Sequence, residues 1–281
     1  MSINGSAGAA LRTSMKGGAV VAVGAFLPIV ARMAEVQGYQ ALYFSGAAHA
    51  HMNGVPDEGL FSRSEVLQDA RKIIAATNLP VIVDVDTGFG GPKGTAQTVR
   101  LFERAGAAAI QIEDQDPYYK RCGHLPGKRL ISPHRMVEKI CAAVAAKTDP
   151  NFMIVARTDA RAVEGLDGAI ARAIAYMRAG ADVVFPEALE SEREFRDFRY
   201  AISVPLLANM TEYGKTPYLT VKQFNEMQYN IVIFPVTALR VALRALSSAL
   251  CLLSHYGTQK PLIDSGNIME RETVNRFLRS R

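Results

Sequence analysis

Short apolar runs rich in β-branched residues alternate along the chain with longer amphipathic stretches. Runs of the first kind are typical of buried strands, and the stretches between them repeat their apolar positions at helical spacing. The stretch 62–77 opens on Ser62, a preferred helix cap, and carries Val66, Ile73 and Ile74 on one side. The apolar runs recur at roughly 20–45 residues, the length of a strand–helix repeat. They cover residues 19–26, 41–46, 80–88, 108–114, 153–160, 183–188, 205–211 and 231–236.

Eight strand-then-helix units in this order predict an α/β fold, a parallel (β/α)8 barrel of the TIM type. Further helical patterns over 94–108 and 165–182 close on Ala-Gly-Ala, where a glycine supplies the left-handed cap. A doubly wound open sheet is the alternative. Its first strand–helix turn should carry a G-x-G-x-x-G phosphate loop, which the sequence lacks.

We interpret residues 1–281 as a single barrel domain. Residues 1–10 are small and polar, and we expect them to form a frayed N-terminal arm. Residues from about 240 to 281 read as helices and exceed what one barrel needs. Extra C-terminal helices that pack against a neighbouring subunit are therefore expected.

Composition narrows the class of protein. The chain is 49% hydrophobic and 21% charged, as in soluble globular domains. We find no secretory signal and no apolar run that looks long enough to span a bilayer, so we expect no membrane segment. Its three cysteines are odd in number and form no C-x-x-C pair, which favours a reduced, cytoplasmic location.

The chain is basic, with a formal net charge of +5. Its lysines and arginines are dispersed, whereas nucleic-acid-binding proteins concentrate them on one face. We therefore expect small polyanionic molecules as partners and no nucleic acid.

Polar residues gather where the predicted strands end, which is the catalytic face of a (β/α)8 barrel. Several of them are separated by two positions and so face the same side of a strand. Burying such pairs is costly unless they are paired or bind a ligand. These residues are Tyr43, Ser45, Asp84, Asp86, Glu113, Asp114, Arg157, Asp159, Glu187, Asn209 and Thr211.

Asp84 and Asp86 form the sharpest pair. Two carboxylates that converge repel each other, and a hard divalent cation relieves the repulsion. Oxygen ligands with several waters suit Mg²⁺, or Mn²⁺, with Glu113 joining through a bound water. The alternative is one metal ligand beside one carboxylate paired with an arginine.

The segment KRCGH, Lys120 to His124, places a thiol among cations just beyond the fourth strand. Lys120, Arg121 and a protonated His124 should favour the thiolate of Cys122. Gly123 and Gly127 give the segment the freedom of a lid. Such a cysteine serves as a nucleophile or as a general acid and base, and the alternative is an exposed thiol in a basic loop.

Two sets of residues give weaker signals. Cys141 and Cys251 lie in apolar helical patterns and are expected to be inert core residues. The stretch HAHMNG carries His49 and His51, which could bind metal but which we interpret as incidental histidines of a loop.

Taken together, these segments resemble the isocitrate lyase and phosphoenolpyruvate mutase superfamily, and within it the 2-methylisocitrate lyases. The resemblance runs from about residue 10 to at least 265. The mutase branch lacks the KRCGH motif, and isocitrate lyases proper read KKCGH in much longer chains. The motifs that carry the resemblance are YFSG, PVIVDVDTGFG, IQIEDQ, KRCGH, KTDPNFMIVARTDA, EGLDGAIARA, FPEA, LANMTEYGKTP and TQK.

The resemblance implies a (β/α)8 barrel whose last helix is exchanged between subunits, usually in homotetramers. It implies cleavage of 2-methylisocitrate to pyruvate and succinate, a step of the methylcitrate cycle of propionate catabolism. Mg²⁺ would be held through Asp84 and Asp86, with Asp57 and Glu113 acting through water. Cys122 would protonate the carbanion-like succinate. Tyr43 or a nearby carboxylate would take the hydroxyl proton.

The remaining site residues also follow from the resemblance. Arg157 matches an arginine that binds a substrate carboxylate in the bidentate manner of a guanidinium. Glu187 matches an active-site glutamate near the lid, and His124 belongs to the same catalytic group. The other substrate-binding matches are Ser45, Gly46, Ala47, Lys120, Arg121, Gly123, Asn209, Thr211 and Arg240.

The sequence departs from the family pattern after Ser45 and after His124. Ala47 replaces a glycine, and the family's R-P-N-K reads L-P-G-K here, so Leu125 and Gly127 put substrate preference in question. The substrate methyl group needs an apolar niche, for which Phe185, Leu206 and Phe234 are candidates.

Other functions stay open at this point. They are a sister lyase for isocitrate or a dimethylmalate-like acid, a phosphonate mutase or hydrolase, and a catalytically silent nucleic-acid-binding protein. The last of these would tolerate loss of Asp84, Asp86 and Cys122, and all three are present.

Overall fold

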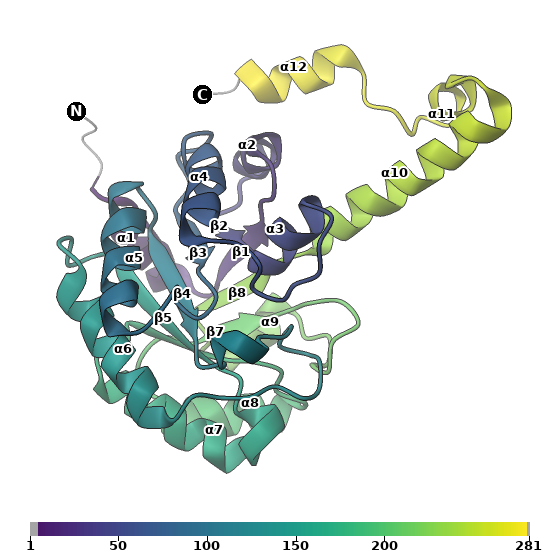
Figure 1. The fold of residues 1–281 in the computed structure, drawn as a ribbon. Helices are drawn as coiled ribbons and strands as arrows, with labels where there is room; N and C mark the ends of the chain where they lie inside the picture. Colours follow the sequence, from purple (N-terminus) through teal and green to yellow (C-terminus); the bar gives the residue numbers. More distant parts are fainter. Residues whose placement is uncertain (1–4, 280–281) are drawn as a thin grey trace.

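The computed structural model describes residues 5–279. Its strands form one parallel sheet in the order β6-β5-β4-β3-β2-β1-β8-β7, and a bridge between Val184 and Leu206 joins the two ends. The predicted (β/α)8 barrel is therefore confirmed, and the doubly wound alternative is wrong (Figure 1). The strands are β1 Val20–Gly24, β2 Ala41–Phe44, β3 Val81–Asp84, β4 Ala109–Glu113, β5 Met153–Thr158, β6 Val183–Pro186, β7 Leu207–Asn209 and β8 Ile231–Phe234.

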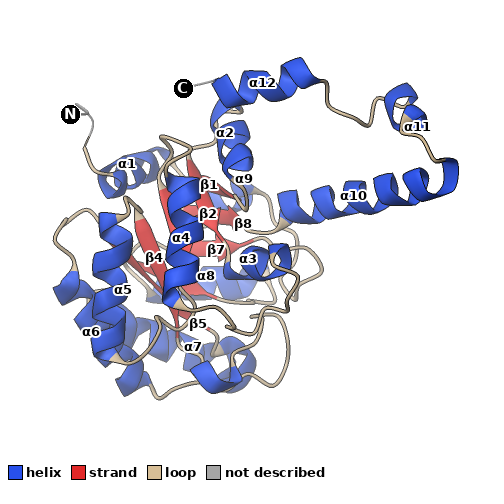
Figure 2. Cartoon of the chain, turned by 45° about the horizontal axis from the view of Figure 1, so that its top comes forward, coloured by secondary structure: helices blue, strands red, loops and turns tan. Residues whose placement is uncertain are grey.

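Helices follow the strands and cover the outside of the barrel (Figure 2). Ser62 caps its helix as predicted, because its side chain accepts from Glu65 N–H while the Glu65 carboxylate accepts from Ser62 N–H. These helices are α2 Pro28–Val36, α3 Gly46–Met52, α4 Arg63–Ile74, α5 Pro92–Arg104, α6 Pro133–Ala146, α7 Arg161–Arg178, α8 Glu192–Ala201 and α9 Val221–Glu226, with short 3-10 turns η1 Met15–Gly17 and η2 Pro117–Tyr119.

Helix α1, Ala7–Ser14, corrects the expected N-terminal arm. Residues 7–10 are helical, and residues 1–4 lie outside the described part of the chain. Leu11 is fully buried and belongs to the cluster of strand side chains inside the barrel. Arg12 donates to Asp182 at 2.6 Å, which ties this helix to the barrel. Residues 7–14 are ordered because Leu11 is buried in the core and Arg12 pairs its charge.

The C-terminal helices are α10 Thr237–Tyr256, α11 Lys260–Asp264 and α12 Arg271–Arg279. Figures 1 and 2 show α10 projecting away from the barrel and α12 returning toward α2, where Arg32 donates to the Leu278 carbonyl at 3.2 Å. The surplus helices are thus confirmed. By length and composition alone α10 could cross a membrane, so our reading that no apolar run reaches that length was wrong.

Candidate active site

One cavity opens at the carboxyl ends of the strands, with a volume of about 650 Å³ including its mouth. Most predicted site residues line it. Gly46 and Asp86 lie directly beside it, and the strand-end carboxylates Asp114 and Asp159 are buried behind it, where Asp159 pairs with Arg157. The lining residues are Tyr43, Ser45, Ala47, His51, Asp57, Asp84, Glu113, Lys120, Arg121, Cys122, Gly123, His124, Arg157, Glu187, Asn209, Thr211, Ile233, Pro235, Val236 and Arg240.

Asp84 and Asp86 point their carboxylates at one spot. A methyl group added to Gly46 would stand 3.2 Å from Asp84 Oδ2 and 3.3 Å from Asp86 Oδ1. Asp84 ends β3, while Asp86 follows with a left-handed φ of 49° that turns it back toward its neighbour. Burial and the adjacent Asp86 raise the pKa of Asp84 to about 6. The two carboxylates therefore repel each other, although Lys120 and Arg157 partly offset their charge.

Lys120 is the nearest cation to this pair. Its ammonium lies 2.8 Å from Asp86 Oδ1 and also contacts Asp57, and its side chain is almost fully buried. The turn that carries Asp86 is supported from below by buried Lys139, which donates to the Thr87 carbonyl. Burial lowers the pKa of Lys139 to about 8. The turn geometry thus depends on a helix that lies outside the barrel.

The KRCGH segment bends over the cavity, and its charges point away from the thiol. Lys120 faces Asp57 and Asp86, and Arg121 faces the Pro126 carbonyl. Burial raises the pKa of the Cys122 thiol, and the carboxylates of Asp57 and Glu187 act in the same direction. Our expectation of a stabilised thiolate was therefore wrong. The resting group is a thiol, the form that a proton donor needs.

The other two cysteines also differ from expectation. Cys141 and Cys251 are both exposed rather than core residues. Cys141 lies on the outward side of α6, and Cys251 lies on α10, which projects from the barrel; an apolar sequence pattern alone reveals neither.

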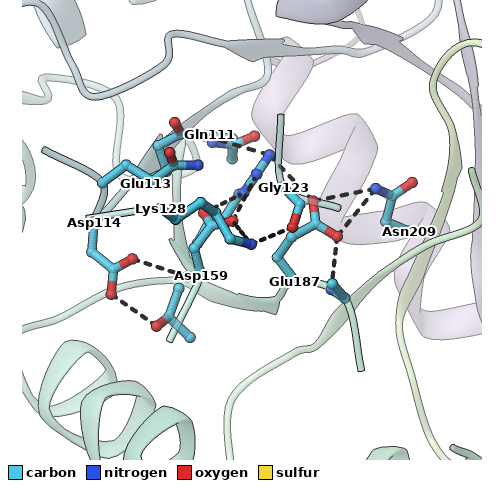
Figure 3. Close-up of polar contacts among 12 residues, drawn as sticks. Gln111, Glu113, Asp114, Gly123, Lys128, Asp159, Glu187 and Asn209 are labelled. Carbon is cyan, nitrogen blue, oxygen red and sulfur yellow. Dashed lines mark hydrogen bonds and ion pairs between the residues drawn. The ribbon is translucent and has the colours of Figure 1, made fainter. Parts of the chain in front are cut away.

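Arg157 is the centre of a buried charge cluster, drawn in part in Figure 3. Its Nε and Nη2 donate to Asp159 at 3.0 and 3.1 Å, and its Nη1 lies 3.4 Å from Glu113 and 3.3 Å from Glu187. Burial opposes the negative charge of Glu187, but Arg157 and His124 outweigh this effect and lower the pKa of Glu187. A substrate carboxylate would therefore meet a guanidinium whose orientation these protein carboxylates already fix.

Tyr43 stands at the floor of the cavity. Its hydroxyl donates to Gln111 Oε1 at 2.6 Å. Burial and the charge of Asp84 raise the pKa of this phenol well above its usual range. Tyr43 is therefore a hydrogen-bond donor and a poor proton acceptor.

The apolar side of the cavity comes from residues that sequence reasoning missed. Ile233, Pro235 and Val236 line it at the end of β8. The proposed niche residues do not line it, because Phe185 packs inside the barrel while Leu206 and Phe234 belong to the outer core. Side chains alternate along a strand, so the inward position of β8 is Ile233 and not Phe234.

His49 and His51 lie on helix α3 rather than in a loop. His49 is buried, packs against Phe61 and lies 2.9 Å from Asp69, whereas His51 lines the cavity. Among the residues described, no group of three or more His, Cys, Asp or Glu side chains is close enough to hold a metal ion directly.

The protonation of Cys122 can be tested directly. Because its pKa is raised, we expect alkylation of Cys122 by iodoacetamide to reach half its maximal rate above the usual thiol value of about 8.5. Peptide mass spectrometry across pH 6–11 measures this rate, with exposed Cys141 as the internal reference. A midpoint for Cys122 below that of Cys141 would contradict the assignment of a resting thiol.

Known proteins match this chain over most of its length. The model of the phosphoenolpyruvate phosphomutase family matches residues 11–253. The 2-methylisocitrate lyase of Aeropyrum pernix is 55% identical over 245 residues, which are 87% of this chain and 79% of that protein. The 2-methylisocitrate lyase of Escherichia coli K12 is 46% identical over 237 residues, 84% of this chain and 80% of that protein.

Solved structures agree with these matches. The crystal structure of 2,3-dimethylmalate lyase superposes with a TM-score of 0.91 at 35% identity, covering 98% of this chain and 92% of that one. Phosphonopyruvate hydrolase in complex with oxalate and Mg²⁺ superposes with a TM-score of 0.86 at 28% identity, covering 97% and 95%. The barrel, the cavity and these matches agree: the chain belongs to the phosphoenolpyruvate phosphomutase family and is a carbon–carbon lyase.

Proposed function

We propose that this protein is a Mg²⁺-dependent lyase that cleaves 2-methylisocitrate into pyruvate and succinate. One observation carries the proposal: the half-buried Cys122 thiol lines the same cavity as Asp84 of the carboxylate pair, and burial raises the pKa of this thiol. Curated relatives named 2-methylisocitrate lyase, at 43–55% identity, support the choice of substrate. The place in propionate catabolism is part of the same proposal.

The donor set fits Mg²⁺. Asp84 and Asp86 supply converging hard oxygens, and Glu113 Oε1 is buried without a hydrogen-bond partner. Two carboxylates plus waters are the usual protein contribution to a Mg²⁺ site, and Mn²⁺ fits the same ligands. Bound there, the ion would polarise the hydroxyl and carboxylate oxygens of the substrate.

Cationic and amide side chains in the cavity are the proposed donors to the substrate carboxylates. The Arg157 guanidinium is fixed by Asp159, and Asn209 donates to Glu187 at 3.3 Å beside it. Arg240 enters the cavity from α10 and pairs with Glu212 at 3.2 Å. These donors sit on different strands and helices, so the barrel holds an acid with several carboxylates at several points.

The proton steps divide between two groups. The substrate hydroxyl loses its proton as the carbon–carbon bond breaks, and pyruvate keeps the new carbonyl group. We assign this proton to Asp84 or a neighbouring carboxylate, because Tyr43 already donates to Gln111 and its raised pKa keeps the phenol protonated. The electron pair of the broken bond stays on the succinate carbon. The Cys122 thiol gives that carbon its proton and is later reprotonated by solvent.

A second acid deserves a test because the solved 2,3-dimethylmalate lyase shares this fold at 35% identity. Ile233, Pro235 and Val236 offer apolar surface to a methyl group in either substrate. One methyl group in an apolar pocket is worth only about 1–3 kcal/mol, so only the measured preference separates the two.

Helix α10 supports the proposal of a homo-oligomer. Leu243, Leu246, Leu250 and Leu253 are exposed, and their spacing of three, four and three residues forms one apolar stripe. A second copy of this chain is the occupant we propose for it, and a tetramer is the proposed assembly. An uncovered stripe of this size is unusual for a monomer.

Disrupting the stripe should dissociate the assembly. We expect Leu246→Asp/Leu250→Asp to shift the particle toward the 30.5 kDa of one chain, because two charges would be buried in the contact. Light scattering coupled to size-exclusion chromatography measures this shift. Arg244→Ala on the same helix is the matched control. A parent protein that already runs as a monomer would contradict the proposal.

The activity is tested by following products directly. Purified protein with Mg²⁺ and 2-methylisocitrate should release pyruvate and succinate in equal amounts, seen by proton NMR. Chelation of the metal should stop the reaction, and added Mg²⁺ should restore it. Cleavage that persists in excess chelator would remove the metal from the proposal.

A further inference from the structure

Lys128 is a buried cation that the proposed chemistry does not use. Its side chain is 1% exposed and its ammonium makes two contacts, with the Gly123 carbonyl and with Asp159 Oδ1 at 3.0 Å. Figure 3 shows Lys128 between these two partners. A buried lysine is rare unless its charge is paired, and here the pairing joins two separate parts of the fold.

The first partner belongs to the loop that carries Cys122. The two ends of this loop are held together at its base, where a β-bridge pairs Gln115 with Leu130 and Asp116 N–H donates to the Arg129 carbonyl at 2.8 Å. Lys128 lies next to this paired base. Gly123 lies in the free part, next to the thiol. The Lys128 contact therefore ties the free part of the loop to its base.

The second partner belongs to the substrate-binding cluster. Asp159 is fully buried and accepts from Nε and Nη2 of Arg157. Burial opposes the negative charge of Asp159, but Arg157 and Lys128 outweigh this effect and lower the pKa of Asp159. One carboxylate thus serves the guanidinium and the lysine that holds the loop.

The loop backbone sits directly on Arg157 in this arrangement. A methyl group added to Gly123 would lie 2.5 Å from Arg157 Nη2 and 2.6 Å from Glu187 Cγ. His124 adds a contact with Glu187 at 3.3 Å and accepts from Lys215 N–H at 3.1 Å. With the loop over the cavity in this way, the Gly123 peptide occupies a narrow space against Arg157 and Glu187.

We propose that Lys128 is a positioning residue that holds the Cys122 loop closed, by bridging the Gly123 carbonyl to the carboxylate that orients Arg157. This bridge couples the position of Cys122, the proton donor, to the position of the Arg157 guanidinium. The inference rests on the proposed function only for its kinetic readout, because loop closure can be measured without substrate.

The test is alkylation of Cys122 in Lys128→Met, a substitution that keeps the length and removes the charge. We expect iodoacetamide to modify Cys122 about tenfold faster than in the parent, because the opened loop exposes the thiol. Exposed Cys141 should react unchanged within the same sample. With 2-methylisocitrate as the substrate, kcat of the variant should fall by a far larger factor than KM rises, as expected for a misplaced proton donor.

Arg129→Met is the matched control, because Arg129 is the adjacent cation and stacks on Tyr119 at 3.9 Å without touching Gly123 or Asp159. It should leave the Cys122 rate at the parent value. A folded Lys128→Met, verified by circular dichroism, whose Cys122 reacts at the parent rate would overturn the proposal. If that variant fails to fold, Lys128→Gln is read in the same way.

Hydrogen exchange of the parent protein gives an independent reading. The amides of residues 121–125 and 127 should be protected in the ligand-free protein, since the loop is held closed. Exchange of these amides at the rate of an unstructured chain would overturn the proposal. Neither measurement depends on cleavage of 2-methylisocitrate, so a failure of the proposed function is distinguished from a failure of this inference.

Discussion

Cys122→Ser should lose about 10²- to 10⁴-fold in kcat while KM for the substrate changes little. The serine hydroxyl keeps nearly the same shape but is a much weaker acid than the thiol. Because burial raises the pKa of the Cys122 thiol, the resting group is a thiol that carries the proton the carbanion needs. Steady-state kinetics with 2-methylisocitrate measure the loss.

Cys141→Ser is the control, since this thiol is exposed on α6 and makes only a weak contact with the Ala179 carbonyl at 3.8 Å. It should retain parent activity. A Cys122→Ser variant with kcat close to that of the parent would show that another group protonates the product.

Asp86→Asn should lower the affinity for Mg²⁺ by about 100-fold or more and abolish activity at ordinary metal concentrations. The amide keeps the size of the side chain and tolerates the left-handed backbone at this position, so folding should survive. What it removes is one charge of the converging pair and the ion-pair partner of Lys120 at 2.8 Å. Calorimetric titration with Mg²⁺ measures the affinity.

Asp197→Asn is the matched control, an exposed carboxylate of α8 whose ion-pair partner Arg193 is 3.6 Å away. It should bind Mg²⁺ like the parent, because surface pairs of this kind contribute little. An Asp86→Asn variant with unchanged metal affinity would place the metal elsewhere.

The positions of the site residues could be predicted because strand order dictates them. Polar residues at strand ends converge in any (β/α)8 barrel, so the sequence alone brought Asp84, Glu113 and Arg157 to one cavity. Alternation along β8 could also have identified Ile233 as inward-facing, had the strand phase been followed.

The state of Cys122 could not be predicted, because it depends on where neighbouring charges point. Sequence proximity to Lys120 suggested a thiolate, but that lysine is directed at carboxylates from two other loops. Contacts across the fold, such as Lys128 with Asp159, likewise leave no periodic signal. Cys251 was expected in the core because an apolar sequence pattern does not reveal that α10 projects away from the barrel (Figure 1).

The most direct measurement is a side-by-side cleavage assay with Mg²⁺, giving the protein 2-methylisocitrate in one reaction and isocitrate in the other. Pyruvate is followed with lactate dehydrogenase and glyoxylate with phenylhydrazine. Our account predicts that kcat/KM for pyruvate release exceeds that for glyoxylate release by at least about tenfold. Equal rates, or faster glyoxylate release, would contradict the assignment of 2-methylisocitrate as the substrate.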